Sequence, residues 1–135
     1  MKISSRGRYI LRAMIELGIN FGGKPISLKN IALNQNISEK YLTQLMGIMK
    51  RAGLVRLKRG VGGGYILVRD PVKITLAQIL YPIEGDMSLI DCISDPVFCI
   101  HSDDCYSRPV WLELSRLIKN YLESTTLEDA IKKIR

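Results

Sequence analysis

The chain has 135 residues and a formal net charge of +7, and hydrophobic residues make up 47% of it. A chain of this length and composition can fold as one domain with a buried core. It has no run of 18 apolar residues that would cross a membrane, and its N-terminus lacks the apolar stretch of a signal peptide. We therefore expect a cytoplasmic protein that does not enter a membrane.

The positive charge is confined to the first half of the chain. Residues 1–70 contain 13 Lys and Arg against 3 Asp and Glu, whereas residues 71–135 contain 7 basic and 10 acidic side chains. The two halves therefore carry +10 and −3. A positive field of this kind attracts a polyanion through phosphate contacts and the release of counterions. Charge alone would favour an ordinary solvated surface, so the interpretation depends on the elements that carry the charge.

Three helices are predicted in the first 53 residues. Hydrophobic spacing predicts the first over residues 5–21. Ser27 is expected to cap a short second helix, and Ser38 a longer third helix that ends at Gly53. A short helix, a tight turn and a longer helix in this order predict a helix-turn-helix.

A β-hairpin is predicted directly after the third helix. Residues 54–57 and 65–68 are rich in apolar and β-branched side chains, and the turn at 59–64 between them contains four glycines. A hairpin in this place is the wing of a winged helix.

The remaining helices are a short one, a long one and a final short one. The first is expected over residues 75–82, where it is opened by a capping box, and the long one from Ser107 to about Leu122. Thr125 and Glu128 predict a second capping box, which opens the last helix. Apolar residues form one stripe along the long helix: Val110, Trp111, Leu114, Leu117, Ile118, Tyr121 and Leu122.

The predicted fold class is mainly α with a small β-hairpin. A winged helix-turn-helix is expected in residues 1–82, a cysteine-containing loop in 83–106, and a dimerisation helix with the C-terminal short helix in 107–135. A stripe such as that of the long helix usually packs in a core, and it also pairs a helix with its copy. A homodimer would place two recognition helices roughly 34 Å apart, about one turn of DNA.

The third helix and the wing supply the predicted contacts with double-stranded DNA. The N-terminal residues of a recognition helix lie near base edges, where Gln can pair with adenine and Thr can touch the methyl group of thymine. Other polar side chains there suit phosphates, and an Arg in a glycine-rich wing suits the minor groove. The candidate DNA-binding residues are Ser38, Lys40, Tyr41, Thr43, Gln44, Lys58, Arg59, Gly60, Gly62 and Gly63.

Enzymatic readings of the glycine run find little support. The run joins two predicted strands, opens no helix and is not followed by the GK[ST] of a P-loop. The chain has one His, no evident pairing of nucleophile and base, and no nucleotide-binding fingerprint. We do not expect an enzyme.

All three cysteines, Cys92, Cys99 and Cys105, lie in one short polar segment. Reduced thiolates bind soft metals and iron–sulfur clusters, but the spacing is wider than the CxxC pairs of structural zinc sites. Spacing alone leaves a metal or cluster as plausible as unliganded or redox-active thiols. Three thiolates leave one coordination position open, for which the nearby candidates are His101, Asp103 and Asp104.

Several segments together resemble a known family. Residues 1–9, 37–55, 59–67 and 126–131 are similar to the corresponding parts of the bacterial IscR, NsrR and CymR regulators. The resemblance implies a winged-helix dimer held by its long C-terminal helix. It also implies transcriptional control, usually of genes for iron–sulfur assembly, sulfur metabolism or nitric-oxide stress.

The cysteines resemble those of the cluster-binding branch of this family, whereas CymR-like members lack them. The resemblance implies that Cys92, Cys99 and Cys105 hold an iron–sulfur cluster, with 2Fe-2S and 4Fe-4S both open. The fourth ligand does not carry over, because Arg8 and Arg108 occupy the positions that supply it in the family. A guanidinium has no free lone pair to donate to a metal.

The expected function is therefore a DNA-binding transcriptional regulator whose promoter binding is controlled by a cluster. One alternative is a thiol- or zinc-sensing winged-helix regulator without a cluster. A second is a cofactor-free module that docks a protein partner.

Overall fold

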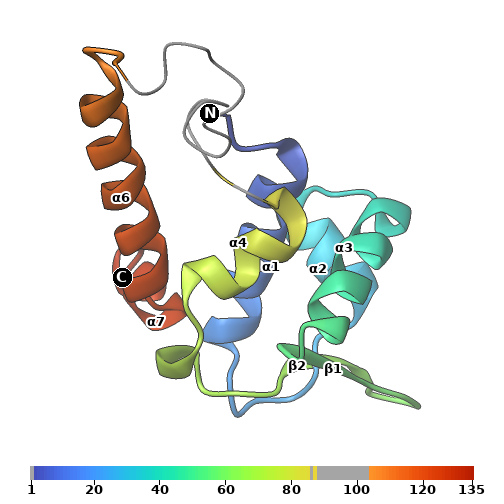
Figure 1. Cartoon of the computed structure of the whole chain (residues 1–135). Helices are drawn as coiled ribbons and strands as arrows, with labels where there is room; N and C mark the ends of the chain where they lie inside the picture. Colours follow the sequence, from blue (N-terminus) through green and yellow to red (C-terminus); the bar gives the residue numbers. More distant parts are fainter. Residues whose placement is uncertain (1, 86, 88–103) are drawn as a thin grey trace.

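The computed structural model describes residues 2–85, 87 and 104–135. Figure 1 shows the helices before residue 85 and the hairpin gathered into one body, with the long helix of residues 108–124 standing along one side of it. The predicted fold class, mainly helical with one small hairpin, is confirmed. The elements are α1 (Ser5–Ile19), α2 (Leu28–Gln35), α3 (Glu39–Arg51), β1 (Val55–Lys58), β2 (Gly64–Leu67), the 3-10 helix η1 (Pro71–Lys73), α4 (Leu76–Glu84), α6 (Arg108–Ser124) and α7 (Leu127–Lys132).

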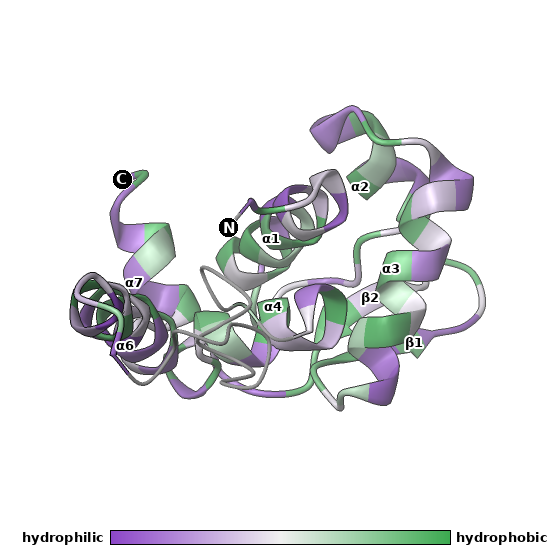
Figure 2. Cartoon of the chain, turned by 45° about the horizontal axis from the view of Figure 1, so that its top comes forward, coloured by the Kyte–Doolittle hydropathy of each residue, from purple (hydrophilic) through white to green (hydrophobic). Residues whose placement is uncertain are grey.

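The helix-turn-helix forms where the sequence predicts it. The hydroxyl oxygen of Ser27 accepts a hydrogen bond from the Asn30 amide, and that of Ser38 accepts one from the Tyr41 amide, both at 3.1 Å. Between the two helices, Asn36 adopts a left-handed conformation with φ of 54°. Hydrophilic residues, purple in Figure 2, alternate with hydrophobic ones along α2 and α3. The hydrophobic faces of α2 and α3 meet that of α1 in a core formed by Ile10, Met14, Leu17, Ile31, Leu42, Leu45, Met46 and Met49.

The hairpin pairs in antiparallel fashion, and the bounds of each strand lie one residue from the predicted 54–57 and 65–68. Val55 lies opposite Leu67. The first strand starts late because the Leu54 amide completes the C-terminal cap of α3 by bonding the Met49 carbonyl at 3.0 Å. The second strand starts at Gly64 because this part of the hairpin also pairs with the segment before α2.

That additional pairing joins the wing to the helix-turn-helix. The amide and carbonyl of Ile26 bond the carbonyl and amide of Tyr65 at 3.1 and 2.7 Å. The two backbones come so close that a Cβ on Gly64 would lie 2.3 Å from the Ile26 carbonyl oxygen. Only glycine fits there, and the wing is consequently fixed to the base of α2.

Helix α4 runs two residues beyond its predicted end at residue 82. Its capping box between Thr75 and Gln78 is present as predicted. Pro82 lies inside the last turn, where a missing amide costs one helical hydrogen bond without ending the helix. Glu84 extends α4 because its carboxylate bonds Ser4, the N-cap of α1, at the other end of the chain.

The capping box of α7 lies one residue later than predicted. Thr126, and not Thr125, caps the helix, and its partner is Asp129. Thr125 is not the cap because its carbonyl accepts a hydrogen bond from the Leu76 amide at 2.9 Å. Leu127 is fully buried in the same core as α1, as is Ile131.

The C-terminal helix therefore packs on the body formed by α1, α2 and α3, although it follows α6 in sequence. The predicted division of the chain at residues 82 and 107 remains a prediction. None of the helices in the part of the chain that the structure describes is long and apolar enough to span a membrane.

Candidate nucleic-acid interface and cysteine segment

The first turns of α3 present four of the predicted DNA-binding side chains to solvent. Ser38, Lys40, Thr43 and Gln44 are all exposed. The hydroxyl of Ser38 accepts the helix-capping bond and still has its own proton to donate. The hydroxyl of Thr43 donates to the Glu39 carbonyl at 2.7 Å, so its proton is not available to a ligand. Thr43 can therefore offer its methyl group and its remaining acceptor capacity.

Tyr41 differs from these four because its ring is half-buried. The ring of Tyr9 on α1 meets it edge to face, with centroids 5.8 Å apart and an interplanar angle of 88°. The Arg12 guanidinium carbon lies 5.6 Å from the centroid of the Tyr9 ring. Sequence reasoning missed Tyr9 and Arg12 as neighbours of this surface. Their spacing of three residues, which places two side chains on one helix face, was the available signal.

The predicted wing residues lie at the far end of the hairpin. Lys58 and Arg59 are exposed. The turn itself requires the glycines, because Gly60 and Gly62 have φ of 100° and 75°. A Cβ on Gly63 would lie 2.2 Å from the Lys58 carbonyl oxygen. The glycines thus have a structural reason that is independent of any ligand, and the two cations are the side chains available for binding.

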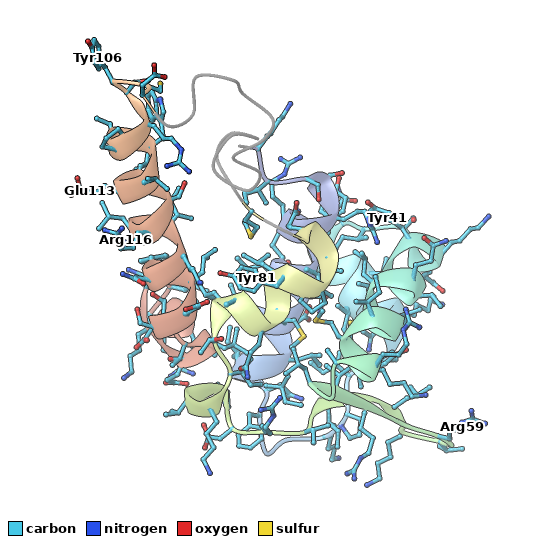
Figure 3. All side chains as sticks on the ribbon, in the orientation of Figure 1. Tyr41, Arg59, Tyr81, Tyr106, Glu113 and Arg116 are labelled. Carbon is cyan, nitrogen blue, oxygen red and sulfur yellow. The ribbon has the colours of Figure 1, made fainter. Side chains whose placement is uncertain are left out.

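The recognition helix and the wing face the same way. Figure 3 shows Tyr41 and Arg59 on the side of the molecule opposite Glu113 and Arg116 of α6. The structure therefore brings the two predicted parts of the DNA-binding surface onto one side. This side belongs to the half of the sequence that carries the net charge of +10.

Cys105 is the one predicted cysteine ligand within the described residues; Cys92, Cys99, His101 and Asp103 lie outside them. Cys105 is partly exposed just before α6, and its Sγ lies 3.4 Å from the Ser107 hydroxyl oxygen. Hydrogen bonding to Ser107, through its side chain and then its main chain, lowers the pKa of the Cys105 thiol.

The remaining predicted ligand positions offer no assembled site in the described residues. Asp104 is exposed beside Cys105. Arg8 is exposed, and Arg108 is half-buried, its Nε lacking a hydrogen-bond partner in the described part of the chain. No group of three or more His, Cys, Asp and Glu side chains that could hold a metal occurs among the residues 2–85, 87 and 104–135.

An apolar groove separates α6 from α1 and α4. It has a volume of about 660 Å³, and hydrophobic side chains line most of it. Much of the predicted stripe of α6 remains exposed beside it: Val110 is 58% exposed, Leu117 59% and Tyr121 51%. Leu122, in contrast, is 8% exposed and packs against α4. The groove is lined by Ile3, Gly7, Arg8, Leu11, Leu76, Leu80, Met87, Leu117, Ile118, Tyr121 and Leu122.

Comparison with known proteins relates the chain to bacterial transcriptional regulators. The sequence model of the family described as Rrf2, iron-dependent transcriptional regulator, matches residues 3–133. The HTH-type transcriptional regulator CymR of Bacillus subtilis is 42% identical over 129 residues, which cover 96% of this chain and 88% of that protein.

Solved structures give the same result. The structure of CymR, the global cysteine regulator of B. subtilis, has a TM-score of 0.85 at 40% identity, covering 98% of both chains. The structure of IscR from T. potens has a TM-score of 0.80 at 36% identity and covers 100% of this chain and 89% of that one. The chain therefore belongs to the Rrf2 family of DNA-binding transcriptional regulators.

Proposed function

We propose that the first turns of α3 and the tip of the wing bind promoter DNA, and that an iron–sulfur cluster held by Cys92, Cys99 and Cys105 controls this binding. The observation that carries the DNA-binding part is the common orientation of the two elements. Lys40 and Gln44 on α3 and Lys58 and Arg59 on the wing are exposed. Tyr41 of α3 and Arg59 of the wing lie on one side of the molecule (Figure 3).

The chemistry of each part of this surface suits a part of the duplex. Gln44 can pair with adenine in the major groove, and the Thr43 methyl group can contact thymine. Lys40, Ser38 and Tyr41 suit phosphates, which fix the protein on the duplex without reading sequence. Arg59, at the tip of the wing, suits the negative potential of a narrow minor groove.

The donor set of the cysteine segment fits a soft metal or a cluster at three positions. Cys105 supports the assignment because it is partly exposed and its hydrogen bonding favours the thiolate, the form that binds metal. When bound, a cluster would supply an iron–sulfur centre sensitive to oxidants and nitric oxide. The fourth ligand is not assigned, because neither Arg8 nor Arg108 can serve.

A second candidate is a thiol sensor without a cluster. The contact between Cys105 and Ser107 favours it equally, because an exposed thiol with a lowered pKa is also the reactive form toward oxidants. The similarity to CymR, described as a global cysteine regulator, is compatible with this reading.

Purification under exclusion of oxygen separates these candidates. A cluster gives visible absorbance together with iron and acid-labile sulfide, and a zinc sensor gives bound zinc without colour. Colourless, metal-free protein whose DNA binding changes with peroxide supports the thiol sensor. The variant with all three cysteines changed to Ala tests control of binding: if it binds promoter DNA as the wild type does, with and without cluster reconstitution, control through the cysteines is excluded.

DNA binding is tested by the salt dependence of affinity for a duplex from the chain's own upstream region. Arg59→Met and Lys40→Met are each expected to reduce the slope of log K against log salt by about one, because each removes one positive charge that displaces a counterion from the duplex. Lys133→Met, at the C-cap of α7, is the matched control and should leave the slope unchanged. Wild-type protein that binds no duplex at low salt would contradict the proposal.

We also propose that the regulator is a cytoplasmic homodimer. The support is the exposed apolar stripe of α6 beside an apolar groove, an arrangement that a second copy of α6 would cover. A homodimer would carry two recognition helices, which suits a DNA site with two half-sites about one helical turn apart.

A further inference from the structure

Arg12 on α1 contacts both helices of the helix-turn-helix, one directly and one through Tyr9. Its guanidinium donates to the Gln35 main-chain carbonyl, and its Nε lies 3.4 Å from the Gln35 side-chain oxygen. The same guanidinium lies against the Tyr9 ring. Tyr9 in turn holds the ring of Tyr41 in the first turn of α3.

A second side chain of α1, Glu16, strengthens the attachment to α2. One carboxylate oxygen of Glu16 accepts from the Gln35 side-chain amide at 3.0 Å, and the other accepts from the Asn34 side-chain amide. Asn34 and Gln35 are the last two residues before the turn that contains Asn36. Arg12 and Glu16 therefore fix the end of α2 at the point where the chain turns toward the recognition helix.

These contacts occupy Arg12 with protein partners rather than with a ligand. The guanidinium has five donors in a fixed plane, and its contacts with Gln35 and the Tyr9 ring orient that plane. The buried core beneath α1, α2 and α3 holds the three helices together without this exposed side chain. Arg12 is accordingly placed to adjust the helix-turn-helix rather than to hold the fold.

We propose that Arg12 and Tyr9 are positioning residues of the DNA-binding surface. Arg12 sets the end of α2, Tyr9 sets Tyr41, and together they determine how the first turn of α3 is presented to a duplex. The inference rests on the proposed DNA-binding surface and adds to it two residues of α1 that act through Tyr41 without contacting DNA.

The experiment compares full-length variants on two duplexes, one enriched by in vitro selection on the wild-type protein and one with its sequence scrambled. Arg12→Met and Tyr9→Leu are each expected to weaken binding to the selected duplex about tenfold, while binding to the scrambled duplex stays within about twofold. The reason is that nonspecific binding depends on charge, whereas the selected duplex needs α3 in register. The melting temperature of Arg12→Met should fall by less than about 4 °C, because Arg12 is exposed.

Conservative variants separate positioning from direct contact. Tyr9→Phe keeps the ring and should bind as the wild type does. Arg12→Lys keeps the charge but not the planar fork, so it should behave like Arg12→Met. If Arg12→Lys restores binding, or if Arg12→Met weakens both duplexes equally and lowers the salt slope by about one, Arg12 contacts a phosphate itself and the proposal is overturned.

A double-mutant cycle tests whether Arg12 acts through Tyr41. In the Tyr41→Ala background, which lacks the ring that Tyr9 contacts, Arg12→Met is expected to cost no more than about twofold, because residues that act as a chain give non-additive effects. An undiminished tenfold loss in that background overturns the proposal. If the wild type binds no duplex, the DNA-binding surface itself fails; if the wild type binds and Arg12→Met is unaffected, only the positioning role fails.

Discussion

The carboxylate of Glu84 accepts two hydrogen bonds from Ser4, from the hydroxyl at 2.6 Å and from the main-chain amide at 3.2 Å. Ser4 is also the N-cap of α1, where its hydroxyl oxygen accepts from the Gly7 amide. The end of α4 is thereby fastened to the start of α1, across 80 residues of sequence.

The position of the Glu84 carboxylate beside Ser4 predicts that Gly7→Ala destabilises the wild-type protein but stabilises a variant without that carboxylate. A Cβ on Gly7 would lie 2.2 Å from the Glu84 carboxylate, so Gly7→Ala displaces the carboxylate and is expected to destabilise the protein by about 1 kcal/mol. In the Glu84→Ala background the nearest remaining atom is the Ile3 Cγ2 methyl carbon at 3.2 Å, which has to give by only a few tenths of an ångström, so Gly7→Ala should become stabilising because Ala favours the helix. Urea unfolding of the wild type, the two single variants and the double variant measures these free energies of unfolding. If Gly7→Ala destabilises the protein equally with and without Glu84, the prediction is contradicted.

The approach of Gly64 to Ile26 predicts that the wing tolerates no side chain at this position. Gly64→Ala places a Cβ 2.3 Å from a backbone oxygen, so it is expected to destabilise the protein by about 2 kcal/mol or more. The matched control is Gly47→Ala on α3, where the nearest atom to an added Cβ is 3.7 Å away. That substitution should stabilise by about 0.5 kcal/mol. Thermal melts decide, and an equal effect of the two substitutions would argue against the close approach.

The capping box of α7 predicts an acid-sensitive contribution to stability. Hydrogen bonds from Thr126 lower the pKa of Asp129 below its ordinary value of 3.8. Because the folded-state pKa is the lower one, the stabilisation is present above pH 3.8 and is lost as the pH falls through the folded-state value. Asp129→Asn should therefore melt lower than the wild type at pH 7, with the difference shrinking toward pH 3. A difference that stays constant over this range would contradict the assignment.

The same box gives a prediction at neutral pH. Thr126→Ala removes the hydroxyl that accepts from the Asp129 amide at 3.1 Å and is expected to cost about 1 kcal/mol. Thr125, the neighbouring residue, is the cap predicted from the sequence. Thr125→Ala should cost less free energy of unfolding, because the group of Thr125 that forms a hydrogen bond is its main-chain carbonyl, which alanine retains. Chemical unfolding of the two variants compares them, and a larger loss from Thr125→Ala would show that the cap is misassigned.

The proposed homodimer predicts that charge on the exposed stripe of α6 separates the subunits. Leu117→Glu, at a position that is 59% exposed, is expected to convert a dimer into a monomer in light scattering after size exclusion. Arg116→Glu, on the preceding residue of the helix, is the control and should leave the mass unchanged. A wild-type monomer, or a dimer that survives Leu117→Glu, would exclude pairing through this stripe.

Local signals in the sequence were sufficient to predict the elements. Ser27, Ser38 and Thr75 act as helix caps as expected, because a capping bond joins residues only two or three positions apart. The glycine-rich turn was found for the same reason. The errors at residues 82 and 125 arose where a distant partner decides the local structure, Ser4 for Glu84 and Leu76 for the Thr125 carbonyl.

The candidate site was predictable to the extent that it consists of exposed side chains on a recognisable motif. Lys40, Gln44 and Arg59 lie where the helix-turn-helix and wing place them. The contact of Tyr9 with Tyr41, and the bonds of Arg12 to Gln35, join segments more than 20 residues apart and follow from the packing of α1. No periodicity within one element reveals such pairs.

Leu122 is buried near the C-terminal end of α6 and Val110 is exposed near the N-terminal end, so this helix is held at one end only within the described part of the chain. The C-terminal end of α6 is held where the chain turns back into the body through α7, and its N-terminal end lies next to Cys105. With 17 residues, the helix is roughly 25 Å long. A small rotation of α6 about its buried C-terminal end near Leu122 therefore displaces its N-terminal end by several ångströms. A force applied at the N-terminal end, beside Cys105, acts on the buried end through the same length of helix.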